Sequence, residues 1–344
     1  MIAFAAPAAR ANTGARAAID LGTSSVKMLV VDQHGRTLVD KKANSNLGAR
    51  AGSDRLILRS AQQRTLAALK ELARVAAEHG VPAGNIELVA TAAVRNADGV
   101  PSAYARRAGK KTGASFIADL VAMGFTRARI LSGAEEALWG ARGAFAGAKV
   151  ASDDDEKFVV FDLGGGSHQV TVATPKAVLG GGSTSVGSHH VFDRVMRDEE
   201  GKALRVLSKQ ALTRVDARLA KDVPELPIPV AEVRGAKPVL IGGLATFLSS
   251  FVGKGIITRG ELEQLREQMS ALPAQKRLDY MQDLWRARNP DREIPSTISA
   301  RGRVMKLPSR FTLLLRMMTL IEKNSAEDTL LLSDTDARHA LVAR

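Results

Sequence analysis

Hydrophobic residues in this chain occur in short runs that end at acidic or small residues. Residues 158–161, Phe-Val-Val-Phe, form one such run, which leads into Asp162, Leu163, three glycines and a serine before apolar residues resume at 170–173. A short run of β-branched and aromatic residues predicts a buried strand, so the segment predicts a hairpin with a glycine-rich tip. Glycine backbones tolerate positive φ and can direct several N–H groups at one anion. Taken alone, the pattern fits a hairpin without a ligand equally well.

The same pattern occurs near the N-terminus. An apolar run ends in Asp20, Leu21 and Gly22, passes through Thr23, Ser24 and Ser25, and returns as an apolar run to residue 31. The repeat predicts two similar α/β lobes, which we expect at 1–147 and 148–344, each presenting a hairpin to a shared cleft. Backbone donors and two carboxylates around one cleft suit a phosphate chain with a divalent cation.

Between the two hairpins, the sequence predicts further strands and helices. A strand at 86–91 precedes Arg95, and a strand at 129–131 precedes a Ser-Gly turn that opens a helix with Glu135 and Glu136 in its first turn. Helices are expected at 60–80, with Ser60 as N-cap, and over 101–123. An arginine at a strand-to-helix junction suits anion recognition, and acidic residues in a first turn complement the helix dipole.

In the second half, a strand at 177–179 is expected to pass into a glycine-rich crossing at 180–187. A strand at 238–241 then turns at Gly242 and Gly243 into a helix, a third glycine turn compatible with phosphate contact. We expect Ser208 to cap a helix, Thr258 and Glu261 to form a capping box, helices at 273–288 and 311–322, and a last strand at 329–332.

Composition narrows the classes of function. The 344 residues are 45% hydrophobic and 25% charged, which is typical of a globular protein of two or three domains. With aromatic residues at only 4%, a nucleic-acid surface built on base stacking is disfavoured. The net charge of +13 favours polyanionic partners, although charge spread for solubility explains it equally well.

The location is predicted from three features. The chain contains no cysteine, which excludes disulfides and thiolate metal sites and fits a reducing compartment. No apolar run approaches a membrane span, and the first residues lack the basic segment of a signal peptide. We therefore expect a cytoplasmic protein with no membrane partner. The six histidines show no metal-ligand spacing, so a histidine-ligated metal is not expected.

With these segments placed, the sequence resembles the exopolyphosphatase / guanosine pentaphosphate phosphatase (Ppx/GppA) family in a short, two-lobe form. The resemblance covers nearly the whole chain. It is carried by the segments at 20–27, 90–95, 131–137, 162–167, 185–188, 239–243 and 330–338. The Ser-Gly-x-Glu-Glu-Ala segment shortly before Asp-Leu-Gly-Gly-Gly-Ser is the most specific of these. The resemblance implies two actin-like (ribonuclease H-like) lobes related by internal duplication.

The resemblance also implies roles for individual residues. Glu136 matches the catalytic base or water-orienting group, Arg95 a phosphate-contacting arginine, and Asp20 and Asp162 carboxylates that bind metal or water. The phosphate-contacting positions, from the resemblance and from the glycine turns together, are Gly22, Thr23, Ser24, Ser25, Gly164, Gly165, Gly166, Ser167, Gly242 and Gly243. The implied activity is Mg²⁺-dependent release of terminal phosphate from inorganic polyphosphate, and whether guanosine pentaphosphate is also a substrate stays open.

The sequence departs from the family pattern at three places. His168 and Gln169 stand where the family usually has Thr-Glu, Leu244 stands where it has Thr, and the closing motif lacks Leu-Arg-Glu-Gly. The missing carboxylate leaves open a weakly active or non-catalytic member that binds polyphosphate or nucleotide. An ATP-dependent kinase of the same superfamily is a further alternative, disfavoured because no region beyond the Gly242-Gly243 turn resembles an adenosine pocket. The oligomeric state also stays open, with a homodimer as one option.

Overall fold

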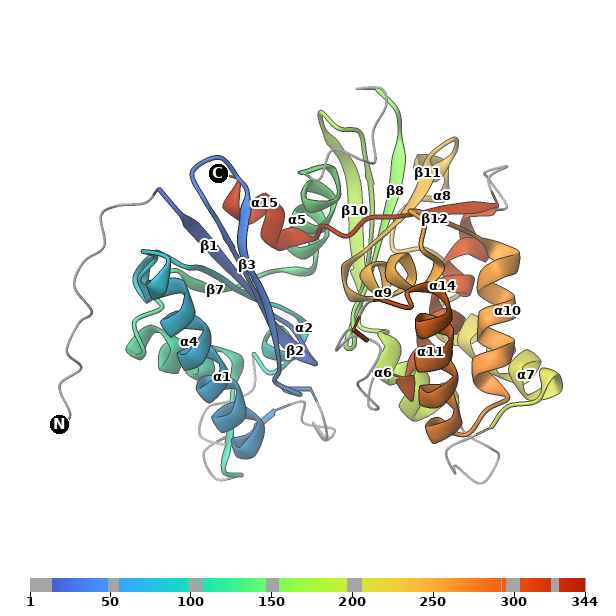
Figure 1. Ribbon diagram of the computed structural model, residues 1–344, viewed down its shortest axis with the longest axis horizontal. Helices are drawn as coiled ribbons and strands as arrows, with labels where there is room; N and C mark the ends of the chain where they lie inside the picture. Colours follow the sequence, from blue (N-terminus) through green and yellow to red (C-terminus); the bar gives the residue numbers. More distant parts are fainter. Residues whose placement is uncertain are drawn as a thin grey trace. The chain divides into compact units, whose positions relative to one another are not determined.

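The computed structural model describes residues 14–48, 56–98, 105, 108–146, 155–196, 206–291, 293–294, 304–322 and 328–343. The chain divides into two compact units (Figure 1). The first comprises Met1–Ser132 and Ala337–Arg344, and the second comprises Gly133–Asp336. This division differs from the expected boundary at residue 147. The helix that carries Glu136 belongs to the second unit, and the end of the chain belongs to the first.

The first unit contains a five-stranded sheet in the order β3-β2-β1-β5-β7. Strands β1 (Arg16–Leu21), β2 (Ser25–Val31) and β3 (Thr37–Asn44) are antiparallel, whereas β5 (Glu87–Ala90) and β7 (Ala128–Ile130) continue the sheet in parallel with β1. The helices of this unit are α1 (Arg59–Glu78), α2 (Ala92–Asn96), α4 (Gly113–Ala122) and α15 (Ala337–Val342), with a short sheet of β4 (Ile57–Leu58) and β6 (Lys110–Lys111).

The second unit contains a six-stranded sheet in the order β10-β9-β8-β11-β13-β12. Strands β8 (Phe158–Leu163), β9 (His168–Ala173) and β10 (Val178–Thr184) are antiparallel, and β11 (Lys237–Ile241) and β13 (Thr329–Leu332) run parallel to β8. Strand β12 (Ile256–Thr258) closes the edge. The helices are α5 (Gly133–Ala146), α6 (Ser188–His190), α7 (Lys209–Asp222), α8 (Val230–Val233), α9 (Gly242–Val252), α10 (Arg259–Ser270), α11 (Ala274–Arg288) and α14 (Leu307–Glu322).

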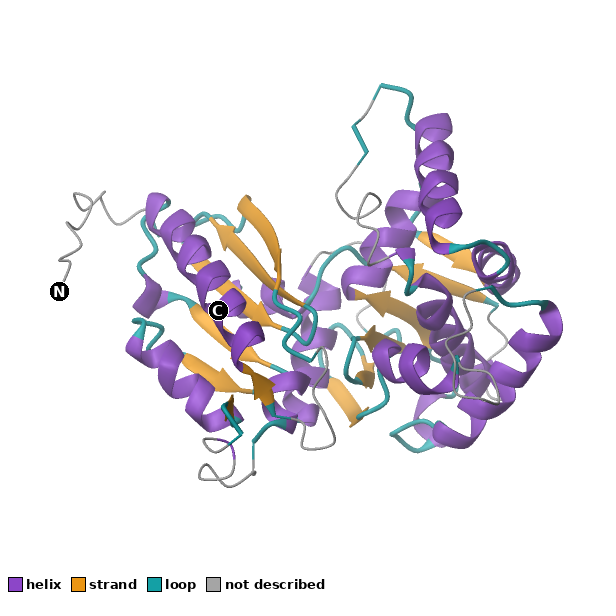
Figure 2. Ribbon diagram, turned by 90° about the horizontal axis from the view of Figure 1, so that it is seen from below, coloured by secondary structure: helices purple, strands orange, loops and turns teal. Residues whose placement is uncertain are grey.

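The two sheets share one topology. In each, three antiparallel strands are followed by two strands that extend the sheet in parallel from the first strand of the hairpin. The hairpin tips agree in detail, because Gly22 N–H donates to Ser25 O at 2.9 Å and Gly164 N–H donates to Ser167 O at 2.9 Å. Helices lie on either side of the strands in each unit (Figure 2). The predicted α/β fold with an internal duplication is therefore confirmed.

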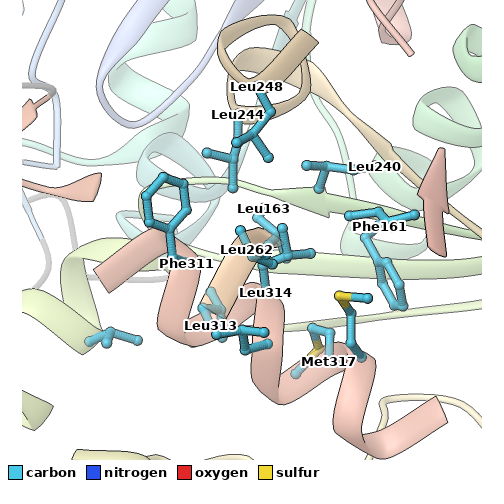
Figure 3. Packing of buried hydrophobic residues seen from close by; sticks show 14 of the residues in the cluster. Phe161, Leu163, Leu240, Leu244, Leu248, Leu262, Phe311, Leu313, Leu314 and Met317 are labelled. Carbon is cyan, nitrogen blue, oxygen red and sulfur yellow. The ribbon is translucent and has the colours of Figure 1, made fainter. Parts of the chain in front are cut away.

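The core of the second unit explains the uninterrupted apolar run before Asp162. Phe158 and Val160 face one layer with α5, whereas Val159, Phe161 and Leu163 face the other layer with α9, α10 and α14. Figure 3 shows Phe161 and Leu163 among side chains of the second layer, including Leu244, Phe311 and Met317. A central strand that is buried on both faces has a continuous run of hydrophobic residues in its sequence. This double burial fixes the position at which β8 ends and Asp162 emerges.

Several local expectations are confirmed and others are wrong. Ser208 accepts a hydrogen bond from Ala211 N–H as N-cap of α7, and Thr258 and Glu261 form the capping box of α10. Ser60 is not an N-cap, because α1 begins at Arg59 after Leu58. The expected helix over 101–123 is confirmed in part, because α4 covers Gly113–Ala122, whereas Lys110 and Lys111 ahead of it form strand β6. The expected glycine crossing at 180–187 is largely strand β10, which pairs with β9.

The last helix completes the first unit. α15 contacts β1 and β2, and Arg338, which is 5% exposed, donates to Met28 O at 3.1 Å and pairs with Asp40. Burying an arginine requires such partners. The sequence alone placed these residues in the second lobe. None of the helices in the described part of the chain has the length and apolarity needed to cross a membrane.

Candidate active site

Asp162 lies where the second-unit sheet meets two helices. It pairs in register with Ile241 on β11 and with Gln169 on β9. A Cβ atom built on Gly242 would lie 3.0 Å from Oδ1 of Asp162, and one built on Gly140 would lie 4.0 Å from Oδ2. The carboxylate is thus flanked by the first turn of α9 and by the middle of α5, and glycine at both positions leaves the room that it occupies.

Glu136 is placed on the same side of α5 as Gly140. The two residues are four positions apart, so they lie one above the other on one helix face. Gly133 and Ala137 of α5 contact the sheet: a Cβ on Gly133 would lie 2.7 Å from Cβ of Ser183, and Thr171 Oγ1 donates to Ala137 O at 3.0 Å. These small residues let α5 sit close to β9 and β10. This contact between α5 and the sheet fixes the rotation of α5 about its own axis. As a result, Glu136 is on the same side of α5 as Gly140, the side next to the Asp162 carboxylate.

Two carbonyl oxygens of the glycine loop between β8 and β9 accept hydrogen bonds from the turn that starts α6. Gly164 O accepts from Ser188 N–H at 3.0 Å and Gly165 O accepts from His189 N–H at 2.9 Å. Within the described residues, the N–H groups of Gly165 and Gly166 donate to no carbonyl or side chain. Adjacent amide donors in a turn form a concave anion site. The predicted phosphate contact of Gly164–Ser167 thus has donors available to make it.

The first hairpin is held in a similar way by the segment after β3. Ser24 O accepts from Ser45 N–H and Asn46 N–H, both at 3.1 Å, and Thr23 O accepts from Gly48 N–H at 3.0 Å. Gly48 is required by space, because a Cβ there would lie 2.3 Å from Cγ2 of Thr23. The first unit therefore fixes the tip that carries Gly22, Thr23, Ser24 and Ser25.

Asp20 lies near the end of β1, and Arg95 lies on α2, the helix that follows the neighbouring strand β5. Asp20 on β1 pairs with Lys27 on β2, with Nζ 3.7 Å from Oδ2. Arg95 on α2 follows β5 and donates from its guanidinium to Leu131 O at 2.9 Å. Thr91 N–H donates to Leu21 O at 3.1 Å, which fixes the start of α2 beside the end of β1.

Gln169 is part of a buried polar network in the second unit. Its Nε2 donates to Ser167 Oγ at 2.8 Å and to Ser183 Oγ at 3.1 Å, and the side chain is 2% exposed. Its Oε1 is buried without a hydrogen-bond partner in the described part of the chain. An unsatisfied buried acceptor is costly and points to a donor, a water or an ion that occupies the site. Gln169 thus links the glycine loop to Ser183, the residue that lies next to Gly133 at the start of α5.

His168 is on the opposite face of β9 from Gln169 and is fully buried. Its Nδ1 lies 2.7 Å from Val186 O and 3.0 Å from Thr184 Oγ1. Burial lowers the pKa of His168, so the ring is neutral near pH 7. His168 therefore supports the turn after β10 rather than the Asp162 side of the sheet.

Gly242 and Gly243 begin α9 at the end of β11. Gly242 has a φ of 78°, a left-handed value that favours glycine. Leu244, the third residue of this turn, is 2% exposed and packs in the core with Phe311 and Leu163 (Figure 3). Leu244, where the family usually has Thr, is therefore part of the hydrophobic core.

The oxygen atoms beside the glycine loop suit Mg²⁺. No group of three histidine, cysteine, aspartate or glutamate side chains gathers within the described ranges. Mg²⁺ needs no such cluster, because it keeps several waters and binds through one or two carboxylates and substrate phosphates. The Asp162 carboxylate and the unsatisfied Oε1 of its register neighbour Gln169 are ligands of the type that Mg²⁺ accepts.

Comparison with known proteins agrees with this arrangement. The sequence model of the Ppx/GppA phosphatase family matches residues 28–286. The chain belongs to the Ppx/GppA phosphatase family. No curated protein sequence matches it. The predicted family membership is confirmed.

Solved structures of this family share the fold. An exopolyphosphatase from Cytophaga hutchinsonii is 17% identical, with 96% of each chain covered and a TM-score of 0.72. The type II variant of the Aquifex aeolicus Ppx/GppA phosphatase is 18% identical, with 96% of this chain and 98% of that chain covered and a TM-score of 0.62. At this identity the likeness to both is one of fold.

Sequence reasoning missed several residues at this site. Ser183 lies on β10, within the segment that the sequence predicts as a glycine-rich crossing, and its hydrogen bond to Gln169 has no sequence signal. The roles of Gly140 and Gly187 were also missed. A Cβ on Gly187 would lie 2.4 Å from Gly165 O, so this glycine permits the close approach of α6 to the loop. The unusual density of glycine at 180–187 was the available signal.

Proposed function

We propose that this member of the Ppx/GppA phosphatase family is a Mg²⁺-dependent phosphohydrolase that releases terminal phosphate from inorganic polyphosphate or from guanosine pentaphosphate. Its main support is the arrangement in the second unit. There Asp162 lies against the Glu136 side of α5, and the glycine loop beside it has N–H donors available to an anion. These are the parts that phosphoryl transfer requires, namely a positioned water and donors for the phosphoryl oxygens.

The chemistry assigned to these residues balances as a hydrolysis. The Glu136 carboxylate accepts a proton from a water molecule while the water oxygen bonds to the terminal phosphorus. The bond from that phosphorus to the bridging oxygen breaks, and the bridging oxygen stays with the shortened chain. The N–H groups of Gly165 and Gly166 stabilise the charge on the transferred phosphoryl group.

Asp162 and Gln169 are the residues that would hold Mg²⁺ in the second unit. Bound Mg²⁺ supplies charge neutralisation at the phosphoryl oxygens. Asp20 is the corresponding carboxylate of the first unit, and we assign it to metal or water binding. Arg95 and the tip from Gly22 to Ser25, also in the first unit, are assigned to phosphate binding.

A binding protein without turnover is the second candidate, and one observation favours it. The Gln169 amide removes a negative charge where the family usually has glutamate, and its Nε2 is committed to two serine hydroxyls. Phosphate release from long-chain polyphosphate, guanosine pentaphosphate and ATP, each with Mg²⁺ and with EDTA, separates the two. Mg²⁺-dependent release from either of the first two substrates supports hydrolysis. Binding of both without release by the native chain assigns it to the second candidate.

A further inference from the structure

The two hairpins have different residues at equivalent positions. Each hairpin contains an aspartate two residues before the first glycine of its tip, and this aspartate has a register partner on the next strand. The partner of Asp20 is Lys27, whereas the partner of Asp162 is Gln169. Both partners follow the last serine of their tip by two residues. Lys27 is therefore the counterpart in the first unit of Gln169 in the second.

In the first unit, Lys27 lies next to a second lysine. Lys42 on β3 is the register partner of Lys27 on the side away from Asp20. Residues directly opposite one another in a sheet have their side chains on the same face. Asp20, Lys27 and Lys42 thus form a row across three strands, which we call the first-unit row. Arg129 on β7 is on the same face, beyond Val89 of β5. The first-unit row is net positive.

The equivalent row of the second unit has the opposite net charge. Ser183 on β10 is the register partner of Gln169, just as Lys42 is the partner of Lys27. Asp162, Gln169 and Ser183 together carry one negative charge and no positive charge. Gln169 Oε1 is buried and has no hydrogen-bond partner within the described ranges. A carboxylate next to such an oxygen attracts a cation, whereas the first-unit row attracts an anion.

Lys27 neutralises the Asp20 carboxylate directly. Its Nζ lies 3.7 Å from Oδ2 of Asp20, and the two side chains are only 17% and 20% exposed. Charges interact more strongly in such a partly desolvated position than they do in water. A divalent cation at Asp20 would have to bind beside the ammonium and would be repelled by it. The ion pair therefore disfavours a metal in the first hairpin.

Lys27 also lies beside the tip that is assigned to phosphate binding. Ser25, the last residue of this tip, is two residues before Lys27 on β2, so both side chains are on the same face of the strand. The hydrogen bond from Gly22 N–H to Ser25 O fixes the tip. A lysine ammonium has three N–H donors, so it can contact the Asp20 carboxylate and a phosphate oxygen together.

We propose that the hairpin of the first unit is a metal-free anion site, in which the Lys27 ammonium, held by Asp20, binds an oxygen of a phosphate group. The chain then holds its divalent cation beside Asp162 and Gln169 alone, and this part rests on the proposed function. Of the two roles assigned to Asp20, metal binding is excluded. Inorganic polyphosphate and the phosphates of a guanosine nucleotide share this chemistry, so both kinds of ligand are used as probes.

The first test counts metal ions on the full chain by EPR, with Mn²⁺, which accepts the same oxygen ligands as Mg²⁺. Asp162→Asn should remove a Mn²⁺ ion that the native chain binds, whereas Asp20→Asn should bind as many ions as the native chain. Lys27→Gln gives the first hairpin the side chain of the second and should add one weaker site. Loss of Mn²⁺ in Asp20→Asn, or no added site in Lys27→Gln, overturns the proposal.

The second test is calorimetric binding of tripolyphosphate and of GTP in EDTA, where no divalent cation is available. Lys27→Gln should weaken binding of one or both about tenfold, the effect of one charge-assisted hydrogen bond. The control is Lys41→Gln, which removes an exposed lysine on the other face of β3 and should change neither affinity. The probe that loses affinity identifies the kind of phosphate bound. Unchanged affinity for both probes in Lys27→Gln overturns the anion site.

A further variant guards against misfolding. Lys27→Gln leaves a mostly buried carboxylate without its ammonium, which costs stability. The double variant Asp20→Asn/Lys27→Gln removes both charges and should be as weak in anion binding as Lys27→Gln. A double variant that binds both probes like the native chain also overturns the anion site.

Failure of this inference and failure of the proposed function give different results. Phosphate release by the native chain, with anion binding that does not depend on Lys27, rejects the anion site and keeps the hydrolase. Anion binding that depends on Lys27, with no phosphate release by the native chain in Mg²⁺, keeps the anion site and rejects the hydrolase.

Discussion

A Cβ atom on Gly242 would lie 3.0 Å from Oδ1 of Asp162, and Gly242 has a φ of 78°. Glycine is therefore needed at position 242 for two reasons. The left-handed backbone favours it, and a side chain would meet the Asp162 carboxylate. The start of α9 thus lies close beside the Asp162 carboxylate. Gly253 at the other end of α9 has a similar φ of 70° but no atom within 4 Å of a Cβ built on it. The two glycines share the backbone requirement and differ in the carboxylate contact.

This difference gives a matched pair of variants. Gly242→Ala and Gly253→Ala should both lose about 1–2 kcal/mol of unfolding free energy, because each places a side chain in left-handed backbone. Only Gly242→Ala should also lower kcat, by about tenfold or more, because it displaces the Asp162 carboxylate. Urea unfolding and phosphate release measure the two effects. Equal kcat in the two variants would show that the Asp162 position does not matter for turnover.

Glu136→Gln should reduce phosphate release by about 10²–10⁴-fold, the usual contribution of a positioned general base. Polyphosphate binding should be nearly unchanged, because the glutamine keeps the shape of the side chain. Glu135→Gln is the control, since Glu135 is in the same first turn of α5 but is not four residues from Gly140. Turnover in Glu136→Gln that matches this control would remove Glu136 from the mechanism.

Gln169→Glu should strengthen Mg²⁺ binding about tenfold and raise turnover, because it adds a charge beside Asp162. The side chain should fit, because the hydroxyls of Ser167 and Ser183 can rotate to donate to a carboxylate in place of accepting from Nε2. His168 does not obstruct this face, since it bonds to Val186 O on the other side of β9. Gln169→Leu is the control and should lose both metal affinity and rate.

Mg²⁺ titration and phosphate release on the two Gln169 variants and the native chain measure these effects together. If Gln169→Glu gains neither metal affinity nor rate, the metal does not bind beside Asp162, or the chain binds without turnover. The first of these would contradict the assignment of Asp162 and Gln169 as metal ligands, and the second would contradict the proposed hydrolase.

The fold should lose stability in mild acid through His189. Burial, together with Lys306 and Arg310, lowers its pKa from an ordinary value of 6.5 to about 3 in the folded chain, so the unfolded chain binds the proton more tightly between these values. The stabilisation is complete above about pH 6.5 and is lost as pH falls, by up to about 2 kcal/mol between pH 7 and pH 5. Urea unfolding of the native chain, His189→Gln and the exposed-site control His34→Gln measures it. An identical pH dependence in His189→Gln and the native chain would contradict it.

Much of the fold follows from local pattern. The run before Asp162 is apolar on both faces because β8 is central in its sheet, and such a run is visible without a structure. The duplication is also visible, because both hairpins end in Asp-Leu-Gly. The sequence predicts only the start of strand β10, at 177–179, because the glycines that follow carry no strand propensity. They are needed for close contacts, as at Gly182, where a Cβ would lie 2.1 Å from Pro227 O.

Contacts between distant segments were beyond sequence reasoning. The bond between Lys306 and His189 joins residues with no shared motif, and the pairing of Arg338 with Met28 and Asp40 crosses nearly the whole chain. By contrast, Glu136, Asp162 and the glycine loop were named from motifs, and the structure brings their elements together within one unit. Motifs thus identified the candidate residues, whereas packing decides which side chains surround them.

The most direct measurement is ³¹P NMR of long-chain polyphosphate incubated with the native chain, in Mg²⁺ and in EDTA. Terminal hydrolysis predicts an orthophosphate signal that grows only in Mg²⁺, while the remaining material stays long and no intermediate chains accumulate early. The same time course with guanosine pentaphosphate tests the second substrate. No orthophosphate from either substrate in Mg²⁺, although both bind, would contradict the hydrolase.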